Sequence, residues 1–214
     1  MHIPINGQFI SLEDPSGLTV EEVAYTLARI CRFGGHLPRL GALSFYSVAD
    51  HSLLVAKILE HWGSTPTVRL VGLLHDAHEA LIGDIITPVK QWFGVVCASK
   101  DAKIDHKVGI TIGRPPVSDE EHAIVKRADQ VALVVETKAL GLNTEMICRE
   151  AVPDWRDALA IAPDLPGLQR LGILVPNRSM AMESVVEQAA QRFLREEEAL
   201  RDLVTLSTRP RIAA

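Results

Sequence analysis

Apolar residues recur at every third or fourth position along most of the chain, which is the spacing of one face of an α-helix. The first such run occupies residues 20–30. Thr19 precedes this run and Glu22 stands three residues after Thr19, so the two have the pattern of a helix-capping box. We therefore expect a first helix over about 20–31.

The same features predict helices along the rest of the chain. Ser47, Thr65 and Ser118 each stand where the cap of a helix is expected. Four prolines between residues 151 and 177 favour loops and short turns in that segment. The further helices that we expect span about 47–61, 65–83, 87–94, 98–112, 118–140 and 180–204. The pattern thus predicts an all-α fold.

The composition is that of a globular protein. With 47% hydrophobic and 23% charged residues, the 214-residue chain can form one sizeable core, so we expect a single domain over 1–214. The net charge of −5 argues against a nucleic-acid polymer as partner. The first four residues begin no basic stretch followed by an apolar core, and no apolar run approaches the roughly 18 residues of a membrane span. We expect a cytoplasmic protein without a membrane partner.

The cysteines do not suggest a site. Cys31, Cys97 and Cys148 are far apart and form no C-x-x-C pair. Their spacing supports neither a disulfide framework nor a thiolate zinc site. Free cysteines usually behave as small hydrophobic residues, and we interpret all three in this way.

Metal-binding side chains occur in three of the predicted helices, as His51, the pair His75-Asp76, and Asp129. Imidazole nitrogens and carboxylate oxygens together suit a divalent ion that is harder than zinc in a thiolate site. A lone histidine in a helix is more often a hydrogen-bonded or exposed residue. The His75-Asp76 pair, however, follows the apolar run 70–74, where unpaired charge is costly. One divalent metal ion between the helices of a bundle would account for all four side chains.

These residues and their flanking segments resemble the HD-domain phosphohydrolases, whose defining pattern is H...HD...D on a helical bundle. The resemblance covers roughly 18–140 and is to the branch with bacterial 5'-deoxynucleotidases and phage deoxynucleoside-triphosphate hydrolases. It implies an HD-type bundle with a metal-binding core over about 18–141, followed by a C-terminal loop and helix over about 142–214. The matching segments are Arg32-Phe33-Gly34-Gly35, 46–52 (YSVADHS), 73–80 (LLHDAHEA), Gly83-Asp84-Ile85 and Thr87-Pro88-Val89-Lys90.

The resemblance also implies roles for nearby polar residues. Glu79 corresponds to a carboxylate that orients or deprotonates the attacking water, and Asp84 to one that binds the sugar hydroxyl or assists the leaving group. Arg32 is the candidate for holding the phosphate, because a guanidinium offers a planar fork of donors. Further candidates for contact with the substrate are Phe33, His36, His78 and Lys90.

Each of these residues has an ordinary alternative. Glu79 could be an exposed helix carboxylate, Asp84 a loop cap, and Arg32 a cation that offsets the dipole at a helix end. The candidate histidines and lysine could be solvated. Phe33 stands where the deoxynucleotidases tend to carry tryptophan, and this departure leaves the sugar and base selectivity open.

The implied activity is metal-dependent hydrolysis of a small nucleotide. Phosphate-ester hydrolysis can need up to ~10²¹-fold acceleration, whereas one positioned acid or base supplies about 10²- to 10⁴-fold, so a metal ion is expected to contribute. Deoxynucleoside monophosphates are the first expectation for the substrate, and deoxynucleoside triphosphates on the same site are the alternative.

The sequence argues against several other classes of protein. The order of residues 75–79 (HDAHE) fits no zinc-peptidase motif, and no P-loop motif is present. A catalytically silent nucleotide-binding regulatory module and a structural helical adaptor remain as alternatives. The amphipathic last helix is expected to pack on its own domain or, in the other interpretation, to form a homodimer.

Overall fold

The N-terminal residues form a β-hairpin that the helical pattern did not predict. The computed structural model describes residues 1–38, 43–86, 89, 92–177 and 179–208, and within them β1 (His2–Ile5) pairs antiparallel with β2 (Gln8–Ser11). Asn6 and Gly7 between the strands have φ angles of 46° and 80°, which is the Asn-Gly turn that matches the twist of a hairpin. The turn residues were visible in the sequence, but strands of four residues carry too short an alternation to stand out.

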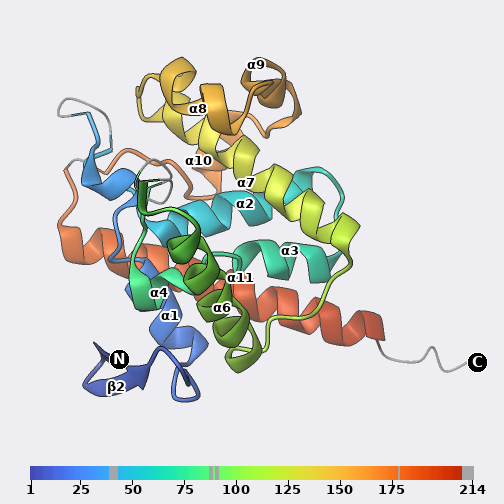
Figure 1. The fold of residues 1–214 in the computed structure, drawn as a ribbon. Coiled ribbons are helices and arrows are strands. Elements are labelled where there is room, and N and C mark those ends of the chain that lie inside the picture. Colours follow the sequence, from blue (N-terminus) through green and yellow to red (C-terminus); the bar gives the residue numbers. More distant parts are fainter. Residues whose placement is uncertain (39–42, 87–88, 90–91, 178, 209–214) are drawn as a thin grey trace, which may run out of the picture.

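The remainder of the described chain is mostly helical, which confirms the all-α prediction. Helices of widely different length follow one another along the chain (Figure 1). In chain order the elements are α1 (Val20–Leu27), η1 (Arg32–Gly35), α2 (Val48–His61), α3 (Pro66–Leu73), α4 (Glu79–Ile82), α6 (Val95–Thr111), α7 (Asp119–Ala139), α8 (Thr144–Ala151), α9 (Trp155–Ala158), η2 (Leu159–Ile161), α10 (Leu165–Arg170) and α11 (Met182–Thr208).

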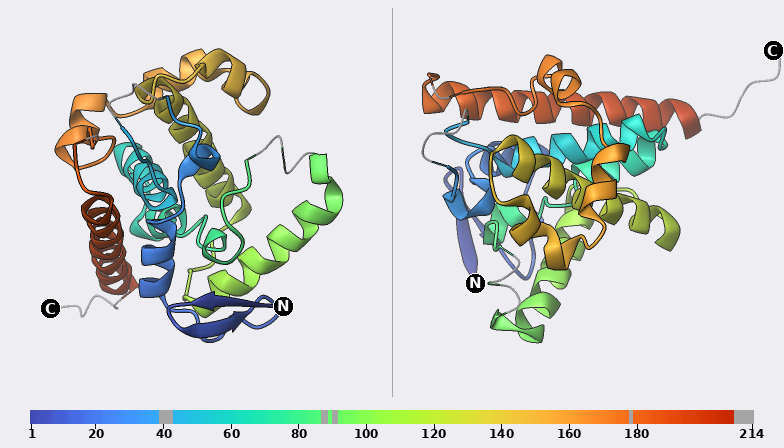
Figure 2. Two further views of the ribbon diagram at one scale, coloured as in Figure 1. Left: turned by 90° about the vertical axis from the view of Figure 1, so that its left-hand side faces the viewer. Right: turned by 90° about the horizontal axis from the view of Figure 1, so that it is seen from above.

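α2 forms the centre of the hydrophobic core. It packs against α3, α7 and α11, and it lies between α7 and α11 in the left view of Figure 2. Its side chains from Leu53 to Leu59 are buried except for Lys57. A helix that is apolar on nearly all sides requires neighbours on all sides, so α2 can carry a polar side chain into the interior.

α11 packs on its own domain. It contacts α1, α2 and α3, and its Phe193 and Leu200 are fully buried. This confirms the first of the two expectations for the last helix. The charged run 195–198 is not wholly at the surface, because Glu197 is buried and pairs with Arg201. The hairpin and α8 lie at opposite ends of the molecule (Figures 1 and 2).

The first helix ends earlier than the predicted residue 31. α1 closes at Leu27, and the chain then extends beside the start of α2. The Val48 N–H donates to the Ile30 carbonyl and the Arg32 N–H donates to the Tyr46 carbonyl. These bonds satisfy backbone groups that a longer helix would have used internally, and they place Arg32 next to α2.

The predicted continuous helix over 65–83 is wrong, because the chain leaves the helix at Leu74 and resumes it at Glu79. In a continuous helix the carbonyl of Gly72 would accept from residue 76 and that of Leu74 from residue 78. Here the Gly72 carbonyl lies 2.7 Å from Nδ1 of His75, and the Leu74 carbonyl accepts from Arg114 over 3.3 Å. Side chains thus compete with the helix for these carbonyls.

Other differences concern short elements. α8 was not predicted, and α9, η2 and α10 provide short helical turns in the proline-rich segment. The helix expected over 87–94 begins at residues outside the described part of the chain. Cys148 is buried and Cys31 half-buried, both as free thiols. None of the helices in the described residues combines the length and apolar character that crossing a membrane requires.

Candidate metal centre

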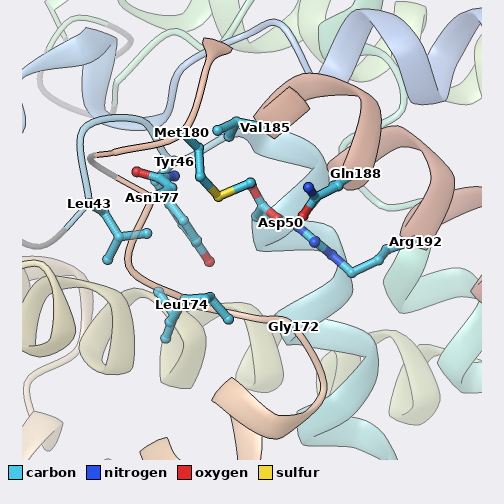
Figure 3. A pocket seen from close by; sticks show the side chains of 11 residues that line it. Leu43, Tyr46, Asp50, Gly172, Leu174, Asn177, Met180, Val185, Gln188 and Arg192 are labelled. Atoms are coloured by element: carbon cyan, nitrogen blue, oxygen red, sulfur yellow. Dashed lines mark hydrogen bonds and ion pairs between the residues drawn. The ribbon is translucent and has the colours of Figure 1, made fainter. Parts of the chain in front are cut away.

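His51 lies in the first turn of α2, where neighbouring side chains fix the backbone. Ser47 and Asp50 form a capping box, in which each side chain accepts the other residue's N–H. Arg192 of α11 donates to Asp50 Oδ1 over 2.7 Å, and both line a cavity of about 170 Å³ (Figure 3). His51 follows Asp50 directly and is fully buried, so these contacts hold its ring in the core.

His75 and Asp76 lie in the irregular turn between α3 and α4, not within a helix. The Nδ1 of His75 is 2.7 Å from the Gly72 carbonyl, to which it donates. A histidine that donates from Nδ1 keeps the lone pair of Nε2 free for a metal ion. The break in the helix therefore sets both the position and the tautomer of this imidazole.

The donor atoms of three predicted ligands converge. His51 Nε2 lies 3.3 Å from His75 Nε2, and Asp76 Oδ2 lies 3.5 Å and 3.2 Å from these two nitrogens. Atoms bound at about 2.1 Å to one ion are about 3.0 Å apart in octahedral and about 3.4 Å apart in tetrahedral coordination. The spacing of this group fits a single metal ion.

Asp129 of α7 faces the same two histidines. Its Oδ1 lies 3.1 Å from His51 Nε2 and 3.8 Å from His75 Nε2. Its carboxylate is about 40% exposed, whereas the side chains of His75 and Asp76 are 16% exposed. Asp129 is thus on the solvent side of the group.

Glu136 supports His51 from behind and was not recognised in the sequence. Its Oε1 lies 2.6 Å from His51 Nδ1 and accepts from the Tyr46 hydroxyl over 3.1 Å. A carboxylate that accepts from the second nitrogen of a metal-binding histidine fixes the tautomer and raises the basicity of the ligand. Glu136 is seven residues after Asp129, on the same face of α7. In the sequence, an acidic residue seven positions after Asp129, on the buried face of the same helix, could have indicated this role.

Arg114 and Asp105, which the sequence did not indicate as part of the site, stabilise the turn that carries His75. Arg114 forms a bidentate ion pair with Asp105 of α6, with both N–O distances 2.8 Å. The same guanidinium donates to the carbonyls of Leu74 and His75 over 3.3 Å and 3.5 Å. Asp105 Oδ1 also lies 3.3 Å from His78 Nδ1. Arg114 thus supplies donors to carbonyls of the turn, and Asp105 holds its guanidinium in place.

The charges around His51 favour its protonated form in the absence of a metal ion. Burial and the nearby Arg32 cation disfavour a charged imidazole, but the carboxylates of Glu136 and Asp129 outweigh them and raise the pKa of His51 to about 9. In the protonated imidazole of His51, a proton occupies the nitrogen that would otherwise bind a metal ion. A divalent ion would therefore compete with protons for this site.

His75 and Asp76 form an oppositely charged pair. Burial opposes the charge on each, yet Asp76 and Asp129 raise the pKa of His75 well above its ordinary value. The neighbouring His75 lowers the pKa of the Asp76 carboxyl despite its burial. The carboxylates beside the two histidines thus favour positive charge at this site.

Arg32 reaches the same group from η1. Its guanidinium nitrogens lie 3.6 Å from Asp84 Oδ1, 3.6 Å from Glu136 Oε2 and 4.0 Å from Asp76 Oδ2. These separations exceed those of hydrogen bonds. Among the described residues the guanidinium makes no hydrogen bond, and its Nε is buried without a partner. The guanidinium thus balances the charge of these carboxylates and keeps hydrogen-bonding capacity that they do not use.

Glu79 and Asp84 flank the turn on its other side. Both are largely buried, and each has a carboxylate oxygen without a hydrogen-bond partner in the described structure. Burial, followed by the charges of Asp76 and Asp84, raises the pKa of Glu79 above its ordinary value. Gly83, at φ 80°, directs the chain back so that Asp84 approaches Arg32.

The remaining predicted residues differ in their placement. Phe33 adopts φ 57°, unusual for a bulky residue, and its ring centroid lies 5.7 Å from Arg32 Cζ. His78 is buried, 3.1 Å from Asp101. His36 is exposed and, within the described chain, contacts none of the metal-ligand residues. Lys90 lies outside the described residues.

A cavity of about 660 Å³ adjoins the site between α3, α6 and α7. Two of the four predicted ligands, His75 and Asp129, line it, as does the predicted substrate residue His78. Its apolar lining includes Val71, Ile110 and Val117. A concave, partly apolar space beside converging polar groups is the usual form of a small-molecule site.

The fold and these side chains define an all-α protein with a site that could hold a metal ion. No family model matches the chain. It is 34% identical over 153 residues to an uncharacterized protein of Rhodobacter capsulatus, with 67% of this chain and 70% of the relative covered, and it belongs to the same family as that protein. It is also 33% identical over 126 residues to the uncharacterized protein YfdR of Escherichia coli, covering 59% of this chain and 63% of YfdR, which is less than two thirds of that relative.

Proposed function

We propose that this protein is a metal-dependent phosphohydrolase of small nucleotides, of the HD-domain type, with deoxynucleoside monophosphates as the first substrates to test. The observation that supports this proposal is the convergence of His51, His75, Asp76 and Asp129, with separations of 3.1–3.8 Å to the two histidine nitrogens. His51, His75 and Asp76 could hold one divalent ion, Asp129 beside the two histidines would be its fourth ligand, and Glu136 and the Gly72 carbonyl would fix the tautomers of the histidines.

The ion that these residues would hold supplies Lewis acidity toward a phosphate oxygen and toward water. Arg32 lies beside the ligands, with its Nε free of hydrogen bonds in the described structure, and would neutralise charge on the phosphate. Glu79 is a buried carboxylate with a raised pKa, which suits a group that orients a water molecule and accepts its proton near neutral pH. Asp84, beside Arg32, would contact the sugar or the leaving oxygen.

The reaction is the hydrolysis of a phosphate ester. The oxygen of water bonds to phosphorus, the bond from phosphorus to the leaving oxygen breaks, and the proton taken from water is returned to that oxygen. Glu79 can carry the proton between the two steps because both its ionised and protonated forms are accessible near neutral pH.

A metal screen coupled to product analysis tests this proposal. The protein is freed of metal, reloaded with Mn²⁺, Co²⁺, Mg²⁺, Fe²⁺ or Zn²⁺, and assayed for release of phosphate, pyrophosphate and triphosphate from a panel of nucleotides. We expect metal-dependent release from at least one deoxynucleotide. No release with any metal would reject the proposal and favour a binding module.

Ligand variants complete this test. His75→Ala and Asp76→Ala should lose both the metal and hydrolysis while their circular-dichroism spectra remain helical. The exposed His36→Ala offers a matched histidine control for metal content. Full metal occupancy in the His75→Ala protein would contradict the site.

A further inference from the structure

Gly109 occupies a helical position that ordinarily disfavours glycine. It lies inside α6, shortly before Thr111 at the end of that helix, and it is buried. Glycine is among the least favourable residues for a helix interior. The φ angle of Gly109 is not left-handed, unlike that of Gly113 (66°), which follows α6 and reverses the chain. The backbone at residue 109 would therefore accept alanine, and the reason for glycine lies in its surroundings.

The guanidinium of Arg114 occupies the space next to the Gly109 Cα. A Cβ at residue 109 would lie 2.7 Å from Arg114 Nη2, 2.8 Å from Nε and 2.9 Å from Cζ. The optimal separation of such non-bonded atoms is about 3.5–4.0 Å. The Arg114 N–H donates to the Gly109 carbonyl over 2.8 Å, so the chain after α6 folds back over this residue. The absence of a side chain at residue 109 lets the guanidinium lie this close to α6.

The guanidinium cannot move away from residue 109 without losing contacts. Both oxygens of Asp105 hold Arg114 at 2.8 Å, and the Arg114 side chain is only 17% exposed. Its bonds to the carbonyls of Leu74 and His75, at 3.3 Å and 3.5 Å, are already longer than most hydrogen bonds. A small displacement of the guanidinium would therefore break these two bonds first. They connect the end of α6 to the turn that carries two candidate ligands.

We infer that Gly109 is a positioning residue of the candidate metal centre, which acts by leaving room for the Arg114 guanidinium against the turn 74–78. A side chain at residue 109 displaces the guanidinium, and the carbonyls of the turn lose their donor. His75 and Asp76 are then no longer held at the spacing that one ion requires. The inference goes beyond the proposed function, because it concerns the binding of a divalent ion and holds whichever reaction the site catalyses.

Gly109→Ala tests this inference through the affinity for Co²⁺ and Zn²⁺. Competition with a chromogenic chelator, well below the melting temperature, measures this affinity. We expect a loss of about tenfold, the scale for loss of a contact that orients a metal ligand, with an unchanged helical circular-dichroism spectrum. Lys103→Ala, at an exposed position of α6, is the control for an alanine substitution in this helix and should keep the parental affinity. A parental affinity in Gly109→Ala overturns the inference.

A double-mutant cycle shows whether Gly109 acts through Arg114. In the Arg114→Ala background no guanidinium occupies the space, so Gly109→Ala should not weaken metal binding further. There the same substitution should raise the melting temperature of the metal-free protein by about 2–4 °C, because alanine favours a helix. With Arg114 present, the steric clash should remove this gain. Equal losses of metal affinity in both backgrounds would mean that residue 109 acts by another route, and they overturn the inference.

A further variant keeps the inference testable if Gly109→Ala alone does not fold. Lysine has no planar group at its end, so Gly109→Ala combined with Arg114→Lys should match the metal affinity of Arg114→Lys alone. A lower affinity overturns the role of the guanidinium. Failure of the proposed function gives a different result. A parent protein that hydrolyses no nucleotide, yet binds the ions in a Gly109-dependent way, rejects the phosphohydrolase and supports the inference, whereas a parent that binds neither ion overturns it.

Discussion

His51 Nδ1 and Glu136 Oε1 lie 2.6 Å apart, and this contact joins the first turn of α2 to the last third of α7. Both side chains are fully buried. A charged carboxylate is stable in the core only with partners, and Glu136 has His51, Tyr46 and, at 3.6 Å, Arg32. The contact therefore couples the position of a candidate ligand to the packing of the whole bundle.

Replacing Glu136 by glutamine should weaken metal binding. The amide keeps the size of the side chain but loses the charge that holds the proton on His51 Nδ1, and loss of such a partner typically costs 10–100-fold in metal affinity. Competition with a chromogenic chelator measures the affinity. Tyr46→Phe, which removes only the hydroxyl that also donates to Glu136, should have a smaller effect. Equal metal affinities for Glu136→Gln and the parent would show that Glu136 does not support metal binding.

Metal binding should release protons. The pKa of His51 is raised to about 9, so at pH 7 this imidazole of the metal-free protein is largely protonated, and the carboxylates of Asp76 and Asp129 raise the pKa of His75 as well. A divalent ion must displace at least the His51 proton, and its affinity should rise with pH up to about 9. Calorimetry in buffers of different ionisation enthalpy counts the protons.

The raised pKa of His51 also makes the stability of the metal-free protein depend on pH. Because the folded pKa of His51 exceeds its ordinary value of 6.5, the proton stabilises the fold fully below pH 6.5, and this contribution is lost as the pH rises through about 9. The melting temperature of the metal-free protein should therefore fall over this range. Zero proton release on metal binding at pH 7, together with a flat stability profile, would be incompatible with a charged His51 imidazole.

Glu79→Gln should leave the metal in place and lower turnover. The amide cannot accept a proton, and a general acid or base contributes about 10²- to 10⁴-fold, so kcat should fall at least about 100-fold. Elemental analysis and steady-state kinetics provide the two measurements. Glu198→Gln, at an exposed position of α11, controls for the loss of one acidic charge. A near-parental kcat would show that Glu79 takes no part in proton transfer and contributes only to packing.

Arg32→Lys should reduce catalytic efficiency more than tenfold with the metal retained. Lysine keeps the charge that the Asp84 and Glu136 carboxylates require, but it lacks the planar fork for two phosphate oxygens. The measurement is kcat/KM alongside metal content. Arg29→Lys, on the neighbouring turn and bonded to the Tyr25 carbonyl, is the matched control. Parental efficiency in Arg32→Lys would place phosphate recognition elsewhere.

Arg114→Ala should weaken metal binding although Arg114 is not a ligand. Without it, the carbonyls of Leu74 and His75 lose a donor and Asp105 loses its bidentate partner, so the turn with two ligands loses its support. We expect a loss of metal affinity of about tenfold or more. Arg114→Lys, which can keep one bond to Asp105, should recover part of it. Arg149→Ala, which removes an exposed arginine, is the control. An unaltered metal affinity in Arg114→Ala would show that the contacts of Arg114 with the turn do not support metal binding.

Local signals in the sequence were sufficient for much of the helical framework. The capping boxes at Thr19, Ser47 and Ser118 are all formed, because a cap depends on residues within one turn. The periodic apolar face of 180–204 likewise predicted α11, which extends over Met182–Thr208. The four candidate ligands were also identified from local patterns and from the family resemblance.

Only the tertiary structure decided how these elements form a site. The Leu74 carbonyl at the helix break accepts from Arg114, 40 residues later in the chain, and no local propensity contains that contact. Glu136 becomes a partner of His51 only when α2 packs on α7. Helix caps are set by neighbours in sequence, whereas the orientation of a ligand and the charge of a cavity are set by residues that meet only in the folded chain.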